Sequence, residues 1–384
     1  MATFMGSPGR IYQTRGGTYT ADGNGMIYGV PATGWDQGDL VDDGATPVIV
    51  VPTANFRNLI DGGDFSINPF QRNIPGLASA NVIATAITNT ATYFADRWFA
   101  VAGASSAVLM ASQANTTVAG FNRALRLTRQ AANTDTTQIT FGQVLETADC
   151  IRLQGQTLTV SFWAASDANY SGGALTVRVV TGTGTNQSAA NLVTGSWTGQ
   201  ANAINSTVTL TTSMVRYQFS AALPSTATQV GVLFQWTPTG TAGAVDGIDF
   251  MGMQLEIGSV ASPFEFRDVQ VELEICQRYA VVFAEPAAAV VLSGAGMANG
   301  TNSQQVTLPL PTPMRTAPTV TLSAGGFRFN IAGTPTAVGG GFAAGSTHTQ
   351  NMITVVGTVT ATSGQATALQ GNGSTGYIVA SADF

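Results

Sequence analysis

The chain has 384 residues, enough for two or three domains, and only 9% of them are charged, against about 25% in an average soluble domain. All 15 basic residues are arginine, which excludes lysine chemistry such as a Schiff base or a Walker-A loop, and the net charge of −6 argues against nucleic acid or anionic membranes as partners. An apolar fraction of 44% together with 44 glycines is typical of a folded protein made of short strands and glycine-rich turns.

Residues 1–55 are predicted to form a small N-terminal module. A strand is expected over 26–30, and the sequence DQGDLVDDGA at 36–45 is compatible with one or two helical turns. The module holds five aspartates, two arginines and few bulky apolar side chains, so it can hardly maintain a core alone. We interpret it as a docking segment that a partner chain or its own trimer stabilises, and a frayed tail with one helical turn is the alternative. The candidate docking residues are Asp36, Asp39, Leu40 and Val41.

Residues 56–270 are predicted to form the largest domain. Strand patterns recur at 123–128, 138–141, 157–164, 175–180, 206–211, 215–219, 230–235 and 248–255. Regularly spaced strands without helical patterns between them indicate an antiparallel sandwich or jelly roll. In the last strand the alternation shifts phase near Gly252, as a β-bulge would cause. Phe162 and Trp163 are neighbours on one strand, so only one of them can face the core.

Residues 271–384 are predicted to form a second, smaller β-sandwich. Its strands are expected at 306–310, 319–322, 327–331, 352–359 and 377–380. From position 280 onward only four charged residues occur, so the surface is expected to be covered by other copies of the chain in a homotrimer. The whole chain is therefore assigned to the all-β class.

Several motifs resemble phage virion proteins. The sequence MQLEIGS…SPFEFR…ELEICQRY, which begins at Met253, is similar to the closing segment of many phage tail-fibre and related virion proteins. NLIDGGDF (58–65), LTVSFWA (158–164) and GIDFMGMQLEIG (247–258) resemble the strands of the carbohydrate-binding-module-like jelly rolls found in phage fibres, and ADRW (95–98) is the phage-type version of its element. The resemblance implies a virion protein, made in the host cytoplasm, with host-surface glycan and other virion proteins as partners.

The sequence lacks the residues of known catalytic centres. It has one histidine, His348, and no HExxH, CxxC or GxSxG motif, so we predict that it is not an enzyme. Cys150 and Cys276 are expected to be free, buried thiols. The opening MATFMGSPGR lacks the apolar core of a signal peptide, and no apolar run is long enough to insert into a membrane.

Candidate binding residues are few. Glycan binding uses exposed aromatic rings, and Trp197, which lies in a loop rich in glycine and serine, is expected to be exposed, followed by Trp236. In the related modules an aspartate near the position of Asp249 often helps to bind a structural calcium, although backbone bonding explains this aspartate equally well; no other cofactor is expected. Arg97 is expected to form a salt bridge with Asp96 beside Trp98.

Two functions remain open from the sequence. The first is a virion fibre or tail subunit that attaches to host-surface glycans through its β-sandwich modules. The second is a purely architectural head-fibre, decoration or adaptor protein that binds no glycan. A polysaccharide depolymerase is disfavoured, because such enzymes usually carry long parallel β-helix repeats and no fixed period is visible.

Overall fold

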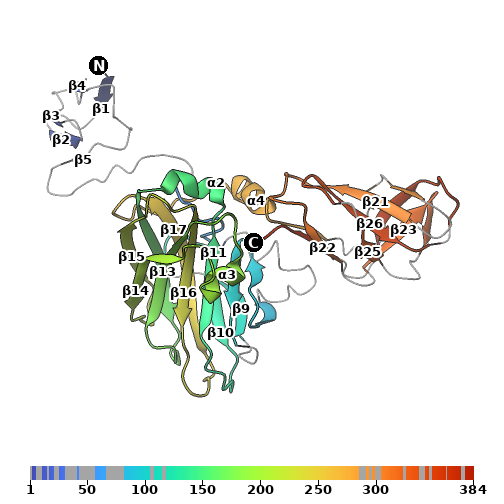
Figure 1. Ribbon diagram of the computed structural model, residues 1–384, viewed down its shortest axis with the longest axis horizontal. Helices are drawn as coiled ribbons and strands as arrows, with labels where there is room; N and C mark the ends of the chain where they lie inside the picture. The colour runs from blue at the N-terminus through green and yellow to red at the C-terminus, as the bar shows by residue number, and fades with distance from the viewer. Residues whose placement is uncertain are drawn as a thin grey trace. The chain divides into compact units, whose positions relative to one another are not determined.

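The structure is a computed structural model in which contacts divide the chain into two units (Figure 1). One unit contains Met1–Arg57 and Ser262–Glu265, and the other contains Asn58–Ala261 and Phe266–Phe384. The described residues are 2–5, 11–14, 17–20, 26–30, 41–42, 57–65, 82–103, 108–114, 118–284, 291–293, 296–298, 304–322, 326–336, 342–345, 348–359, 361–372 and 377–384.

The N-terminal module consists of short antiparallel strands where it is described. Strand β1 (Ala2–Met5) pairs with β4 (Met26–Val30), and β2 (Ile11–Thr14) lies between β3 (Gly17–Thr20) and β5 (Val41–Asp42). The strand predicted over 26–30 is confirmed. The helical turn predicted over 36–45 is wrong at Val41–Asp42, because their pairing with β2 imposes an extended backbone. The other docking candidates, Asp36, Asp39 and Leu40, lie outside the described residues.

Two six-stranded antiparallel sheets form the first sandwich. Sheet A has the strand order β15-β12-β17-β10-β9-β6, and sheet B has the order β14-β13-β16-β11-β8-β7. The strands are β6 (Val82–Ile87), β7 (Thr92–Ala95), β8 (Trp98–Val101), β9 (Val108–Ala114), β10 (Arg123–Arg129), β11 (Ile139–Val144), β12 (Thr157–Ser166), β13 (Leu175–Gly182), β14 (Ala201–Val208), β15 (Val215–Ala222), β16 (Gln229–Trp236) and β17 (Asp246–Ile257). The helices are α2 (Thr147–Cys150), η1 (Ile151–Leu153), α3 (Ala189–Thr194) and α4 (Val269–Gln277).

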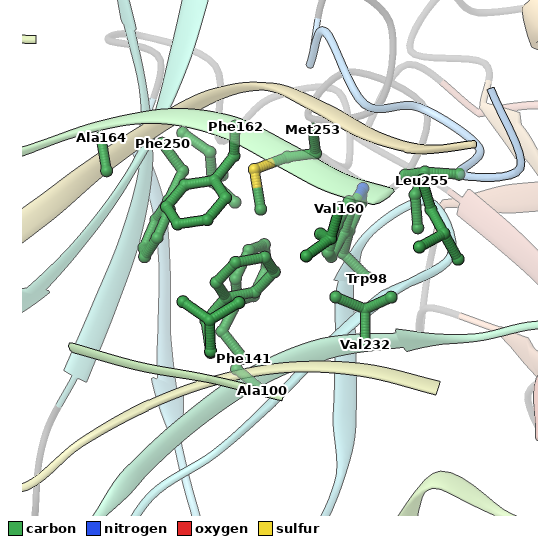
Figure 2. Packing of buried hydrophobic residues seen from close by; sticks show 14 of the residues in the cluster. Trp98, Ala100, Phe141, Val160, Phe162, Ala164, Val232, Phe250, Met253 and Leu255 are labelled. Carbon is green, nitrogen blue, oxygen red and sulfur yellow. The ribbon is translucent and has the colours of Figure 1, made fainter. Parts of the chain in front are cut away.

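The core of the first sandwich is aromatic and fills the space between the sheets (Figure 2). Phe162 and Phe250 from sheet A meet Phe141 and Phe234 from sheet B, with ring centroids 4.9 Å apart for Phe162–Phe234 and 5.4 Å for Phe141–Phe250. Trp98 stacks on Phe141 at 4.6 Å. Alternate residues of every strand point inward because the side-chain period of a strand is two, so Phe162 is fully buried and its neighbour Trp163 lies on the outer face.

The predicted strands of this sandwich are present, with one displacement. The strand predicted over 206–211 is observed as β14, Ala201–Val208. Its first half is rich in asparagine, and the two asparagines Asn202 and Asn205 have low strand propensity. Pairing with β13 along seven positions overrides this propensity and moves the strand toward the N-terminus.

The predicted bulge in β17 is confirmed at Gly252. Its φ of 58° is left-handed, and the register with β12 shifts between Ser161 and Trp163. The extra residue returns Met253 and Leu255 to the core face. A Cβ at position 252 would lie 2.6 Å from ring atoms of Phe121 and Trp163, so both the backbone angle and the space require glycine.

Gly252→Ala is expected to destabilise the protein by about 2–4 kcal/mol, because left-handed strain adds to a clash with two rings. Gly173 is the matched control: its φ is 63°, but nothing lies within 4 Å of the position that a Cβ would take there. Gly173→Ala should therefore cost only about 1 kcal/mol. Urea unfolding of both variants measures the difference, and equal losses would show that packing around the bulge is unimportant.

The second sandwich has its own core. Its sheets have the orders β18-β28-β22, β19-β27-β23-β24 and β20-β21-β26-β25. The strands are β18 (Ala280–Ala284), β19 (Val291–Ser293), β20 (Gly296–Ala298), β21 (Gln304–Pro309), β22 (Thr319–Leu322), β23 (Phe327–Ile331), β24 (Thr334–Thr336), β25 (Phe342–Ala344), β26 (Met352–Gly357), β27 (Thr367–Gly371) and β28 (Tyr377–Ser381). A cluster around Phe329, Ile353 and Leu369 is separate from the aromatic core of the first sandwich. The exact domain boundaries at 55 and 270 stay a prediction.

Both cysteines are buried and free, as predicted for Cys150 and Cys276. Burial raises the pKa of the Cys150 thiol to about 12, so it stays protonated and inert at neutral pH. In the part of the chain that the structure describes, every helix is too short or too polar to span a bilayer.

Candidate functional site

Trp197 is buried, which corrects the expectation that it is exposed. Only 3% of its surface is accessible, and its indole Nε1 donates a 2.9 Å hydrogen bond to the Ser188 carbonyl. The segment that contains α3 folds over the outer face of sheet B, and the ring packs there with Leu192 and Leu233. Trp197 therefore fixes this segment to the sheet and offers no ring face to a ligand.

Trp236 is also buried, with 3% of its surface accessible. It lies on the inward side of β16, two residues after Phe234, and its ring centroid is 6.4 Å from that of Phe250. The period of the strand explains this position, because Phe234 and Trp236 share one face. The prediction of Trp236 as an exposed glycan contact is therefore wrong.

Asp249 pairs with an arginine. Its two carboxylate oxygens accept hydrogen bonds from Arg126, from Nε at 2.7 Å and from Nη2 at 2.6 Å. Asp167 contacts the same guanidinium at 3.0 Å. Among the described residues no group of three or more acidic, histidine or cysteine side chains is arranged to hold a metal ion. The positive charge beside Asp249 and Asp167 is the guanidinium of Arg126, and the structural calcium stays a prediction.

A second, fully buried arginine closes one end of the first sandwich. Arg129 donates to Asp246 at 2.8 Å and to the Ser171 hydroxyl at 3.1 Å. Its Nη2 also donates to the carbonyls of Asn133, Asp135 and Gly240, at 2.9, 2.9 and 3.1 Å. One internal cation therefore connects the loops that follow β10, β12 and β16.

Removal of divalent cations is expected to leave the melting temperature unchanged, because guanidinium groups neutralise Asp246 and Asp249. Arg129→Met, by contrast, leaves the Asp246 carboxylate buried without a counter-charge and should cost about 3–5 kcal/mol. Thermal unfolding with and without EDTA, for the native chain and for Arg129→Met, measures both effects. A fall of several degrees in the native chain with EDTA would show that a metal ion stabilises it.

The Arg97 side chain contacts residues from two other motifs singled out in the sequence. Its side chain is buried, donates from Nε to Asp61 at 3.0 Å and from Nη2 to the Val144 carbonyl at 2.5 Å, and lies 3.5 Å from the ring centre of Tyr279. The salt bridge described for Arg97 beside Trp98 is with Asp61, whereas the expected partner was Asp96. The opening loop, the ADRW element and the CQRY element thus meet at one guanidinium.

Glu146 extends this cluster to the helix ends. It precedes α2 and accepts hydrogen bonds from Arg278 Nε at 2.7 Å and from the Tyr279 hydroxyl at 2.5 Å. Burial alone would raise the pKa of Glu146, but the hydrogen bonds from Arg278 and Tyr279 outweigh it and lower the pKa below its ordinary value of 4.5. The charges of this cluster are paired with one another, so the cluster organises the fold.

Glu146→Gln is expected to cost about 1–2 kcal/mol at pH 7, because an ion pair becomes a neutral contact. Since the pKa of Glu146 is lowered by folding, its contribution is complete above about pH 4.5 and is lost as the pH falls through the folded-state value. The stability difference between the two proteins should therefore shrink on acidification. Urea titrations from pH 7 to pH 3 measure it, and a constant difference would contradict the assignment.

The outer face of sheet B divides into an apolar and a polar half. The apolar half, with Phe99 and Leu233, is covered by the segment of α3. On the polar half, side chains from four adjacent strands form a hydrogen-bonded line, which we call the polar row. Its members are Asn202 on β14, Arg178 on β13, Gln235 on β16, Thr140 on β11 and Gln138 immediately before β11.

The bonds of the polar row are specific in geometry. Arg178 donates to Asn202 Oδ1 from Nε at 3.0 Å and from Nη2 at 2.7 Å, and from Nη1 to Gln235 Oε1 at 3.2 Å. Gln235 Nε2 donates in turn to Gln138 Oε1 at 3.1 Å and to Thr140 Oγ1 at 3.0 Å. The two ends of the row, Asn202 and Gln138, are exposed.

The row holds fixed amide and guanidinium groups, which suit recognition of hydroxyl-rich ligands and contain no nucleophile. The polar row was not predicted from the sequence, because the predicted glycan contacts were aromatic rings. The signal was nevertheless present: Arg178 interrupts the apolar run LTVRVV and Gln235 interrupts VLFQW. Both occupy the outward positions of strands whose other face is core.

Comparison with known proteins gives fold similarity at low scores. No protein-family model and no curated protein matches the chain. A CBM4 structure is 20% identical and matches 52% of this chain and 99% of its own length, with a TM-score of 0.30. The CBM22-1 xylan-binding domain from Paenibacillus barcinonensis is 14% identical, with 48% and 99% covered and a TM-score of 0.28. The enzymatically active domain of bacteriophage CBA120 tailspike protein 4 is 11% identical, with 42% and 19% covered and a TM-score of 0.31.

These TM-scores are all below 0.5, so the assignment to the β-sandwich class rests on the sheets described above. The match covers less than a fifth of the tailspike structure. The activity of the rest of the tailspike is therefore not carried over to this chain.

Proposed function

We propose that this chain is a structural subunit of a phage virion fibre or tail that attaches to host-surface glycans through the polar row of sheet B. The observation that carries the proposal is the row itself. It places amide and guanidinium groups in a fixed line on the polar half of the sheet face, with exposed polar groups at both ends. Such groups bond sugar hydroxyls with defined geometry.

The dimensions of the row fit an oligosaccharide. Neighbouring strands are about 4.8 Å apart, so four strands extend the row over about 14 Å. Thr176, Asn205 and Thr207 lie beside it on the same face, and the two β14 residues are exposed. Gln235 and Thr140 are buried within the row. A chain of a few sugar rings laid across the strands would therefore meet Asn202, Arg178 and Gln138.

Catalysis is not part of the proposal. The acidic residues of the first sandwich that are near one another are engaged by internal partners: Asp246 by Arg129, Asp249 by Arg126, and Glu256 by Gln254 at 2.7 Å. A pair of carboxylates that serves as acid and base in glycoside hydrolysis needs free oxygens. We propose binding without turnover.

The proposed assembly is a homotrimer in the virion, with the N-terminal module as the contact to other virion proteins. The support is compositional: an N-terminal region with few apolar residues, and a C-terminal region with almost no charge. Light scattering of the purified chain measures the mass of the assembly directly.

A purely architectural fibre, decoration or adaptor protein is the second candidate. The burial of both Trp197 and Trp236 favours it, because neither ring is available for stacking on a sugar. The internal ionic cluster around Arg97 also fits a protein that is built for rigidity.

A glycan array probed with the purified chain separates the two candidates. Native protein is expected to bind a subset of host-type glycans, and Asn202→Ala should weaken this binding about tenfold by removing an exposed amide of the row. Gln130→Ala is the matched control, since Gln130 is an exposed amide outside sheet B. Absence of binding by the native chain would support the architectural function instead.

A further inference from the structure

One charged side chain stands alone on sheet B. Arg178 is the only charged residue in the six strands of this sheet. Between positions 168 and 215, which include the covering segment of α3, it is the only charged residue in the sequence. Sheet A differs, because Arg126 and Arg129 on β10 each pair with an aspartate on or beside β17.

All partners of Arg178 are neutral. Its three hydrogen bonds end on the amide oxygens of Asn202 and Gln235, and no carboxylate of the described residues lies within ion-pair distance. A guanidinium has five N–H groups, so one N–H remains on each terminal nitrogen. At least six other arginines of the same unit contact carboxylates: Arg97, Arg126, Arg129, Arg152, Arg267 and Arg278.

This arrangement has an energetic consequence. Arg178 is half-buried, and burial lowers the pKa of Arg178 with no acidic group to oppose the effect. The two amides hold the planar fork in one orientation, which removes much of the entropy that a flexible side chain loses on binding. A desolvated, oriented and uncompensated cation binds an incoming anion more strongly than a solvated one does.

We propose that Arg178 recognises an acidic group, carboxylate or phosphate, on the glycan that occupies the polar row. This inference rests on the function proposed above and names its ligand class: an anionic saccharide whose acid group accepts hydrogen bonds from the two terminal nitrogens of Arg178. The hydroxyls of the neighbouring sugar rings bond the amides of Asn202 and Gln138. Arg178 determines specificity, and the amides align the chain.

The surroundings favour a saccharide over other anions. A free inorganic anion would need only the guanidinium, whereas the row continues for two strands on one side of it and one on the other. Nucleic acid requires several basic residues along its backbone, and sheet B supplies one. An acidic saccharide carries neutral hydroxyls on both sides of an acid group. The row likewise has amides on both sides of one cation.

Matched polymers test the charge requirement directly. Polygalacturonate and its fully methyl-esterified form differ only in the carboxylate charge, and a phosphomannan before and after phosphatase treatment differs only in phosphate. The native chain is expected to bind at least one acidic member at least about tenfold more tightly than its neutral counterpart, and this preference should weaken as salt rises. The two polymer pairs distinguish a carboxylate ligand from a phosphate ligand.

Variants of Arg178 test whether this residue causes the preference for the acidic polymer. Arg178→Gln should abolish the preference for the acidic polymer, and Arg178→Lys should retain only part of it, because lysine keeps the charge without the fork. Arg152→Gln is the matched control: it also removes one positive charge, but Arg152 is exposed on η1, outside sheet B. Circular dichroism and thermal unfolding verify that each variant is folded.

The outcomes separate the inference from the function on which it rests. Equal binding of acidic and neutral polymers, unchanged in Arg178→Gln, would overturn the inference and leave glycan attachment standing. Loss of preference in Arg152→Gln as large as that in Arg178→Gln would also overturn it, since net charge alone would then explain the effect. Failure of the native chain to bind any polymer or any array glycan would overturn both.

Discussion

The buried guanidinium of Arg97 is the interaction on which the organisation of the molecule depends. Burying a charge is expensive unless it is paired, and Arg97 has a carboxylate, a backbone carbonyl and an aromatic face as partners. These partners come from the opening loop, from β11 and from Tyr279, the second residue after α4. Phe384 lies 5.4 Å from the same guanidinium, so the C-terminal residue joins the cluster. Segments nearly 290 positions apart are thus fixed around one charge.

The two sheets of the first sandwich use charge in opposite ways. Sheet A combines arginines and aspartates in pairs, such as Arg126 with Asp249, and these pairs stabilise the fold. Sheet B has one arginine among amides and hydroxyls, and two N–H groups of this arginine remain unused. Because an ion pair that is already formed gains little from a ligand and an uncompensated charge gains much, we propose sheet B as the binding surface.

The positions of the tryptophans decide what kind of recognition this surface can offer. Trp197 fixes the covering segment and Trp236 fills the core, so neither presents a ring to a sugar. Recognition then depends on hydrogen bonds and charge, which are directional and discriminate strongly between ligands that differ in one polar group. Such a surface suits selective attachment more than broad adhesion to any polysaccharide.

The sequence by itself determined the all-β class, the strands at 319–322 and 327–331, the inward position of Phe162 and the bulge at Gly252, because these follow from local alternation and backbone angle. Tertiary structure decided the burial of Trp197, the partner of Asp249 and the existence of the polar row. Each of these depends on which strands become neighbours: Asp249 meets Arg126 across 123 positions, and Arg178 meets Gln235 across 57. Strand order is set by the packing of two whole sheets, and no local pattern encodes it.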